Sequence, residues 1–442
     1  PPDKVGPVPA PATLQMAIDW LRPLLFNIFV SRNLKASPLA GEDAALEIDS
    51  VALAVMSVNI MCFATAYGFD GSIDAYAPVA FGAGNTVELH LVLYRQLLLL
   101  LILTIAAAAI LLHSESLLLM IGQPQALAHR TSEILAVLFW SVPGDFAYDC
   151  LGRWMKAQQL HGSVAACAVL GLLVNVAVNL LFYDPENPIL GPVFALILQN
   201  SALPVMLSIA HLRKAKMVLV PPASVCSDLL PQLSTSIYNT CWTCAEMWAW
   251  EAQVFEASAL GSGAAASYAL LSSTYSLFIM IPCGPVIAFS ALLGEALGQG
   301  QLQYGVLLLK VTLLMGLIMV VLYAVPMVMA RDAFADLLSG GVPQVESNVA
   351  FVVPIIMVMH LVDIGFNTLK VWLVVRKLQR FGAVMSLGCY YGIGLPFGFF
   401  LAFNCSLGLS GLWLGLGAAV LVGTIMSGVR AWMDYGKAMC DN

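Results

Sequence analysis

The sequence has 442 residues, of which 60% are apolar and only 10% are charged, and its mean hydropathy is +0.87. Soluble domains carry about 25% charged residues, because their surface needs polar cover. A water-soluble fold of this length is therefore excluded, and lipid is the expected solvent. The net charge of −7 gives no basic footprint for nucleic acid, so no nucleic-acid partner is expected.

The apolar residues fall into twelve long runs along the chain. A helix needs about 20 mostly apolar residues to cross the hydrocarbon core, and each run is about that long. The chain is therefore predicted to be an all-α integral membrane protein with twelve transmembrane helices. The predicted spans are residues 14–33, 46–69, 92–112, 129–151, 163–183, 188–211, 229–257, 265–290, 305–329, 347–369, 382–403 and 409–433.

Six spans lie on each side of a basic segment that contains Pro221 and Pro222. This segment, residues 213–228, is predicted to be a cytoplasmic linker between two six-helix lobes. The remaining domain predictions are an N-terminal tail at 1–13, an N-lobe at 14–212, a C-lobe at 229–434 and a C-terminal tail at 435–442.

Lysine and arginine are distributed unevenly over the predicted loops. One set of loops and helix ends is basic, and the alternate set is mainly acidic. Because cytoplasmic loops carry the excess of Lys and Arg, both termini are predicted to be cytoplasmic. The membrane is expected to be the plasma membrane or that of an organelle such as the vacuole. The basic set comprises Arg153, Lys156, Arg213, Lys214, Lys216, Lys370, Arg376, Lys377, Arg380, Arg430 and Lys437.

The two halves of the chain resemble each other. The Gly-rich stretch at 80–84 follows the second span, and a similar stretch at 296–300 follows the eighth, 216 residues later. Asp145 likewise precedes Asp363 by 218 residues. Equivalent points are six spans apart, an even number. The two lobes are therefore expected to be parallel repeats, related by a pseudo-two-fold axis along the membrane normal.

Several predicted spans are interrupted by Pro and Gly. Backbone groups freed by such breaks survive in a membrane only where protein buries them or where they line a wet cavity. The interruptions therefore favour a transporter over a passive membrane anchor. They occur at Pro143-Gly144, Pro282, Gly284, Pro285, Pro354, Gly394 and Pro396.

Three carboxylates lie inside predicted spans of the C-terminal half: Glu246 and Glu251 on the seventh span, and Asp363 on the tenth. A charge at mid-bilayer costs roughly 2.5–3.5 kcal/mol, so it is a functional candidate by default. A desolvated carboxyl group can exchange a proton near neutral pH, and its charged form attracts a cationic substrate. Competition between proton and substrate for one site is what antiport requires, so these acids are predicted to serve proton coupling and substrate binding.

Helix geometry limits how these acids cooperate. Glu246 and Glu251 are five residues apart, about 140° around a helix, so they cannot share one narrow stripe. His360 is three residues before Asp363 and shares its face. Aromatic faces attract organic cations, and although packing explains each aromatic residue singly, a group of them near acids indicates a cavity. The predicted cavity residues are Trp250, Tyr275, His360 and Tyr238. Asp145 and Asp149, near a predicted helix end, are favoured as structural residues.

Short motifs follow one another from about residue 40 to about residue 435. They are Asp74 to Gly84, Glu246-Met-Trp-Ala-Trp-Glu251, Met280-Ile-Pro282 with Gly294-Glu-Ala-Leu-Gly298, His360-Leu-Val-Asp363, Gly394-Leu-Pro396, and Gly408-Leu-Ser-Gly-Leu-Trp413-Leu-Gly415. In this order and with these gaps, the chain resembles the multidrug and toxic compound extrusion (MATE) transporters, in their eukaryotic branch.

The resemblance implies a V-shaped pair of six-helix lobes that alternate between inward and outward openings. It also implies export of organic cations or metabolites against an inward flow of protons. Glu246, Glu251 and Asp363 match the family's acids on spans seven and ten, and Tyr275 resembles a tyrosine beside the site. Some relatives have a further Glu after that tyrosine, where this chain has Ser276.

Other functions stay open at this point. The same carboxylates could couple transport to sodium, and a flippase for lipid-linked precursors or a receptor or scaffold without transport are further alternatives. Acidic charges within the spans count against a flippase, and the repeats and broken spans count against a scaffold. No nucleophile–base or zinc-ligand arrangement is found, so neither an enzyme nor a metal or other cofactor is expected. The chain is expected to act as a monomer in the bilayer, with a small organic substrate and protons as partners.

Overall fold

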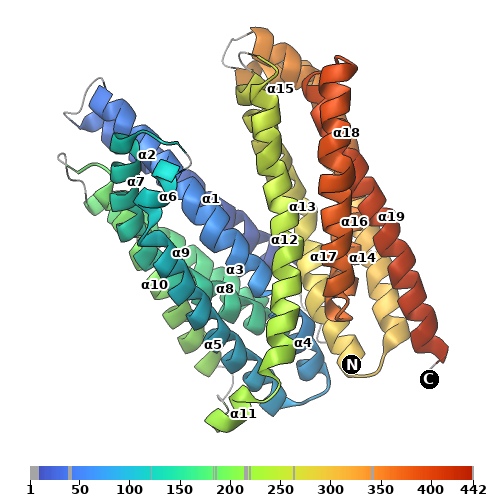
Figure 1. The fold of residues 1–442 in the computed structure, drawn as a ribbon. Coiled ribbons are helices and arrows are strands. Elements are labelled where there is room, and N and C mark those ends of the chain that lie inside the picture. The colour runs from blue at the N-terminus through green and yellow to red at the C-terminus, as the bar shows by residue number, and fades with distance from the viewer. Residues whose placement is uncertain are drawn as a thin grey trace. The chain divides into compact units, whose positions relative to one another are not determined.

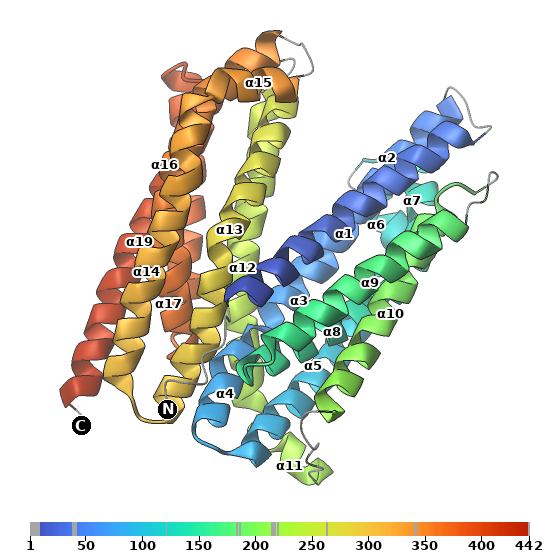
Figure 2. The ribbon, with the colours of Figure 1, turned by 180° about the vertical axis from the view of Figure 1, so that it is seen from behind.

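A computed structural model describes residues 9–37, 42–120, 122–182, 184, 187–213, 218, 221–261, 264–339 and 343–440. These residues are almost entirely helical, and none of them forms a strand. Figures 1 and 2 show the helices from two opposite sides. The sequence prediction of an all-α membrane protein is therefore confirmed. The helices of the first half are α1 (Pro9–Ala36), α2 (Glu42–Val58), α3 (Ala64–Phe69), α4 (Gly71–Gly82), α5 (Thr86–Leu111), α6 (Ser114–Met120), α7 (Gln125–Leu138), α8 (Val142–Ala157), α9 (His161–Leu181), α10 (Leu190–Leu212) and α11 (Pro222–Cys226).

The helices of the second half are longer, and one of them is interrupted by π-helical turns. These turns follow α17 at Gly388–Gly394 and α18 at Phe400–Asn404, and a third π-helical turn, at Asn59–Phe63, joins α2 to α3. The helices are α12 (Leu229–Ser258), α13 (Ala264–Gly298), α14 (Leu302–Met329), α15 (Arg331–Ser339), α16 (Pro343–Val375), α17 (Gln379–Leu387), α18 (Leu395–Phe399) and α19 (Leu409–Cys440).

Ten helical stretches of the described chain are long and apolar enough to cross a membrane. They correspond to ten of the twelve predicted spans, and the stretches that contain α1 and α12 are not among them, so the number twelve stays a prediction. The largest difference concerns the second span, which was predicted to end at 69. The helix continues to Gly82 through Pro78, because membrane helices tolerate a proline where neighbouring protein accommodates it.

The chain divides into two compact units, one of Leu14–Ser236 and the other of Pro1–Thr13 together with Ile237–Asn442. The boundary therefore falls inside α12, later than the linker predicted at 213–228. Residues 214–217, 219 and 220 of that linker lie outside the described residues. The structure also differs at the predicted tails, since α1 begins at Pro9 and α19 continues to Cys440.

The internal repeat is visible in the backbone. After α4, the amide of Asn85 donates to the carbonyl of Ala80 at 3.0 Å, and after α13 the amide of Gln301 donates to that of Ala296 at 2.8 Å. Gly84 and Gly300 have φ values of +69° and +74°, which glycine adopts without a steric penalty. The same helix ending thus recurs with the 216-residue offset of the sequence.

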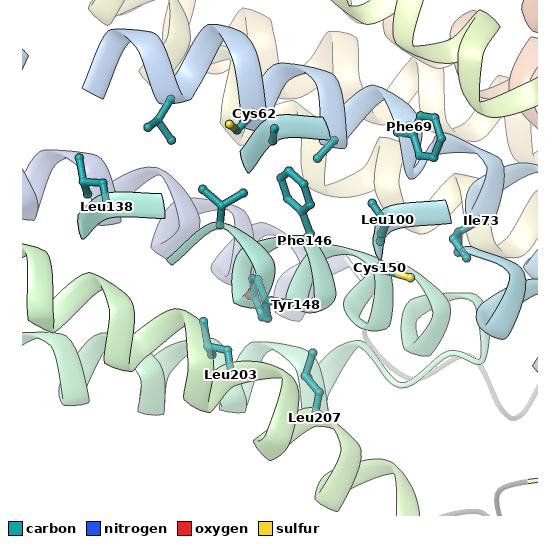
Figure 3. Close-up of a cluster of buried hydrophobic side chains, with 14 of the residues drawn as sticks. Cys62, Phe69, Ile73, Leu100, Leu138, Phe146, Tyr148, Cys150, Leu203 and Leu207 are labelled. Atoms are coloured by element: carbon teal, nitrogen blue, oxygen red, sulfur yellow. The ribbon is translucent and has the colours of Figure 1, made fainter. Parts of the chain in front are cut away.

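Each unit is built around one central helix. In the first, α8 packs against α4, α5 and α10, and in the second, α16 packs against α13, α14 and α19. Figure 3 shows part of the apolar core around α8, with Phe146 and Cys150 buried among side chains such as Leu203 and Leu207. Polar side chains on the inner faces of these helices, such as Asp363 on α16 and Arg153 on α8, are therefore buried inside their units.

The outer surface is apolar as well. Helix α14 exposes Leu314, Ile318 and Leu322 along one face, and α19 exposes Ile425 and Val429. Soluble monomers rarely expose contiguous apolar surface on this scale. The hydrocarbon of a bilayer covers such a surface without cost, so these faces are the lipid-facing side of a multi-pass membrane protein.

Glycines allow α19 to approach the interrupted helix closely. A Cβ atom added to Gly415 would overlap the backbone of Gly398 and the carbonyl oxygen of Gly394, whereas a Cβ on Gly388 would meet no atom within 4 Å. Small residues at such crossings let helix backbones pack directly in membranes. The packing of α19 therefore depends on Gly415.

We expect Gly415→Ala to destabilise the protein by about 1–3 kcal/mol, the usual cost of forcing extra volume into a packed core. The measurement is thermal unfolding of the purified protein in detergent. Gly388→Ala is the matched control, because it adds the same methyl group where space is open. Equal unfolding temperatures for the two variants would contradict the close approach.

Candidate functional site

The predicted site residues come from three neighbouring helices of the second unit. Glu246 and Trp250 lie on α12, Tyr275 on α13, and His360 and Asp363 on α16. We call Glu246, Tyr275, His360, Asp363 and Lys370 the C-terminal cluster. The spacing of three between His360 and Asp363 puts both on one face of α16, as expected from the sequence.

Asp363 is the most completely buried acid of this cluster. Its residue is 5% exposed, and its Oδ2 accepts a hydrogen bond of 2.6 Å from the hydroxyl group of Tyr275. The ring of Tyr275 lies 4.6 Å from that of His360, centroid to centroid. On the other side of His360, its Nδ1 lies within hydrogen-bond distance, 3.1 Å, of the Tyr323 hydroxyl. A chain of titratable and polar groups therefore connects α13, α14 and α16 inside the unit.

Glu246 is held by a residue that sequence reasoning placed elsewhere. The ammonium group of Lys370 donates to Glu246 Oε2 at 2.8 Å, and it lies 5.2 Å from the centre of the Trp242 ring. Lys370 had been counted among the basic loops and helix ends. It lies instead within α16, before its end at Val375, and its side chain is only 20% exposed. The opposite charge of Glu246 stabilises the ammonium group of Lys370 within this spanning helix.

An aromatic group surrounds Tyr275. Its ring lies 4.7 Å from Trp250 and 5.8 Å from Trp413, centroid to centroid, and Trp413 in turn lies 5.4 Å from Tyr268. Trp413 and Tyr268 are fully buried. The indole nitrogen of Trp413 and Nε2 of His360 have no hydrogen-bond partner within the described chain. Buried polar atoms without a hydrogen-bond partner are uncommon, and these two belong to residues of the same aromatic group as Tyr275.

Two predicted residues stand apart from the cluster. Glu251 is exposed, and Tyr238 is half-buried. Neither takes part in the ion pairs, hydrogen bonds or ring contacts described for the C-terminal cluster. Glu246 and Glu251 are about 140° apart around the helix, which accounts for their different surroundings, since Glu246 pairs with Lys370 and Glu251 is exposed.

The first unit contains a network of buried charges that sequence reasoning did not assemble. Arg22 on α1 pairs with Asp19 and with Asp145, each at 3.1 Å. The hydroxyl of Tyr148 donates to Asp19 Oδ1 at 3.1 Å. Asp145, favoured from the sequence as a structural residue near a helix end, therefore takes part in a link between α1 and α8.

A second part of this network lies further along α8. Arg153 donates to Asp149 at 2.9 Å and to Asp74 on α4, and its guanidinium carbon lies 4.2 Å from the centre of the Tyr67 ring. Asp145, Asp149 and Arg153 are spaced four residues apart, so they form one stripe on α8. That spacing was the available sequence signal, and it was missed because each residue was judged singly.

A family comparison agrees with the sequence resemblance. A family model described as MatE matches residues 11–181 and 243–400, well over half of the chain. The chain belongs to the MatE family. The match covers residues of both units and includes Glu246, Tyr275, His360, Asp363 and Lys370.

Curated relatives and solved structures extend the comparison. The chain is 26% identical over 412 residues to multidrug and toxin extrusion protein 1 of Oryctolagus cuniculus, covering 91% of this chain and 72% of that protein. It is 25% identical over 385 residues to the Homo sapiens protein of the same name, covering 86% of this chain and 67% of that protein. Its fold resembles the crystal structure of the eukaryotic MATE transporter AtDTX14, with a TM-score of 0.82, 19% identity and coverage of 98% and 96% of the two chains. A crystal structure of MATE in the bent conformation gives a TM-score of 0.85 at 15% identity, covering 98% of this chain and 95% of that chain.

Proposed function

We propose that this chain is a secondary active transporter, not an enzyme, that exports small organic cations in exchange for protons by alternating access. The observation that carries the proposal is the position of Asp363. It is a buried carboxyl group on a membrane-spanning helix, and it accepts a hydrogen bond from Tyr275, whose ring packs against that of His360. Such a group can bind a proton or act as the counter-charge for a cation, and the two states exclude each other.

The aromatic rings supply the second part of the proposed recognition. The ring of Tyr275 packs against those of Trp250 and His360, and its hydroxyl group donates to Asp363. An organic cation is stabilised by the face of an aromatic ring as well as by a carboxylate, and this stabilisation is stronger where water is removed. Export of drugs and toxins, as in the names of the relatives, fits this combination of acid and aromatic groups.

We further propose how the chain is oriented in the membrane and which ion drives transport. The Lys/Arg distribution supports cytoplasmic termini, and the carboxylates support proton coupling. Sodium remains the alternative ion, because carboxylate oxygens bind it too. The substrate is proposed to be small and organic, the protein a monomer, and the membrane the plasma membrane or that of an organelle.

The test is uptake of a fluorescent organic cation into inside-out vesicles that contain the full chain. An imposed pH gradient, acidic inside, is expected to drive accumulation, and collapse of this gradient is expected to stop it. Accumulation driven only by a sodium gradient would show that sodium, and not the proton, is the coupling ion. No accumulation of any cation under either gradient would refute the proposed function.

Glu251 provides a separate prediction within this proposal. It is exposed and outside the C-terminal cluster, yet a second acid near the transport route is expected to attract the cation. Glu251→Gln is therefore expected to slow uptake by about tenfold, because an exposed charge steers the approach of a cation. Asp332→Gln, which changes an 82% exposed side chain on α15, is the control. Uptake by Glu251→Gln at the normal rate and with unchanged coupling would show that Glu251 has no role in transport.

A further inference from the structure

We propose that Lys370 is a built-in occupant of the acid site, an ammonium group of the chain itself that a cationic substrate must displace from Glu246. The inference rests on the proposed function and specifies how its acid site is filled. It begins from the ion pair of 2.8 Å between Lys370 Nζ and Glu246 Oε2, which joins α16 to α12.

The surroundings of this ammonium group are those that recognise an organic cation. Glu246 supplies the negative charge, and the face of Trp242 lies 5.2 Å from Nζ. A carboxylate together with an indole face is a typical seat for alkylammonium ligands. We call Glu246 and Trp242 together the seat, and in this chain the cation that occupies it is the side chain of Lys370.

The seat is held in place by packing. Trp242 is fully buried, and its ring lies directly against Gly382 of α17, where an added Cβ atom would overlap it. The ring therefore cannot follow Lys370 if the lysine leaves. Lysine, in contrast, has a flexible stem of four carbons, so its ammonium group can leave Glu246 by rotation about the bonds of its own side chain.

The stripe of polar residues on α16 connects this seat to Asp363. His360, Asp363, Asn367 and Lys370 follow one another at intervals of three, four and three residues, which keeps them on one face. Asn367 donates a hydrogen bond of 3.0 Å to the Asp363 carbonyl. One acid and one ammonium group therefore lie along this stripe, and the ammonium group pairs with Glu246 of α12. A substrate cation that binds to Glu246 thus changes the charge balance on the helix that carries Asp363.

Displacement of a tethered cation has a measurable consequence. In wild type, a substrate must compete with Lys370 for Glu246. Without Lys370 the competition ends, so cation binding should become tighter, whereas a lysine with a purely structural role would leave affinity unchanged or reduced. The gain must also require Glu246, because no other group of the seat carries negative charge.

The experiment measures equilibrium binding of tetraphenylphosphonium to the full chain, purified in detergent. Lys370→Met is expected to bind it about five- to tenfold more tightly than wild type, as for one partly desolvated charge contact, and Lys370→Met/Glu246→Gln is expected to lose that gain. Lys310→Met is the matched control, since Lys310 is an exposed lysine within the spanning helix α14. Thermal unfolding of each variant confirms that it is folded.

The outcomes separate this inference from the proposed function. No binding by wild type and by Lys370→Met alike would overturn the export of organic cations. Binding by wild type without a gain in folded Lys370→Met would overturn the role of Lys370 alone.

A measurement on wild type covers the case in which Lys370→Met does not fold. Reductive methylation of Lys370, read by mass spectrometry relative to Lys310, is expected to rise about threefold or more when tetraphenylphosphonium saturates the protein, because an amino group released from its hydrogen bond to Glu246 becomes accessible to the reagent. Unchanged or lower methylation of Lys370 with the cation bound would overturn displacement.

Discussion

Replacing Asp363 with Asn is expected to reduce proton-driven uptake of an organic cation by about 100-fold or more, the scale of loss for a group that transfers a proton. Asn keeps the shape of the side chain and still accepts the hydrogen bond from Tyr275, but it can neither carry a negative charge nor exchange a proton. We therefore expect the free energy of unfolding to change by less than about 1 kcal/mol. The measurement combines vesicle uptake with thermal unfolding in detergent.

Asp332→Asn is the control for this prediction, because its side chain is exposed on α15. It makes the same chemical change and is expected to leave uptake unaltered. If Asp363→Asn is folded and still accumulates the cation at a rate near that of wild type, Asp363 is not the coupling group. If it is unfolded, Asp363 acts in the fold rather than in transport.

Replacing Arg153 with Met is expected to destabilise the protein by about 3–5 kcal/mol, the cost of leaving a buried charge without its partner. The Arg153 side chain is 9% exposed, and it pairs with both Asp74 and Asp149. Without it, Asp74 on α4 and Asp149 on α8 lose the guanidinium group that pairs with both of them, and Lys156 is left as a cation that interacts with them. Thermal unfolding of the purified protein in detergent measures the loss.

A second substitution distinguishes this electrostatic cause from lost packing. Arg153→Met/Asp74→Asn removes one of the stranded carboxylates and is expected to recover part of the stability. Arg331→Met, which changes a 48% exposed side chain, is expected to have no measurable effect. A double variant no more stable than Arg153→Met would show that the guanidinium group acts through packing, including its contact with Tyr67.

The positions of the helices followed from the sequence because hydropathy reports the solvent of each residue. Lipid-facing residues such as Leu314 and Ile318 and buried ones such as Phe146 are both apolar, so a long apolar run identifies a span whichever way it faces. The same property hides where a helix ends. The predicted second span ends at residue 69, where α3 ends, but α4 begins at Gly71 and continues to Gly82 through Pro78.

The candidate site was predictable where one residue carried the signal and obscure where two distant residues had to meet. Asp363, His360 and Tyr275 stood out as polar groups in apolar spans, and the structure brings them together. Lys370 was assigned to a helix end because its partner, Glu246, lies 124 residues away. The pairs of Arg153 with Asp74 and of Arg22 with Asp145 were missed for the same reason, since hydropathy gives no information on tertiary contacts.

The boundary between the two units crosses a helix rather than a loop. Leu229–Ser236 belongs to one unit and the rest of α12 to the other. The chain can change direction in a loop through a few backbone dihedral angles, whereas each turn of a helix is fixed by hydrogen bonds from N–H(i) to O=C(i−4). Trp242 and Glu246 lie on this same helix, beyond the boundary. At this boundary the chain therefore passes from one unit to the other as a continuous helix, and the same helix carries Glu246, the partner of Lys370.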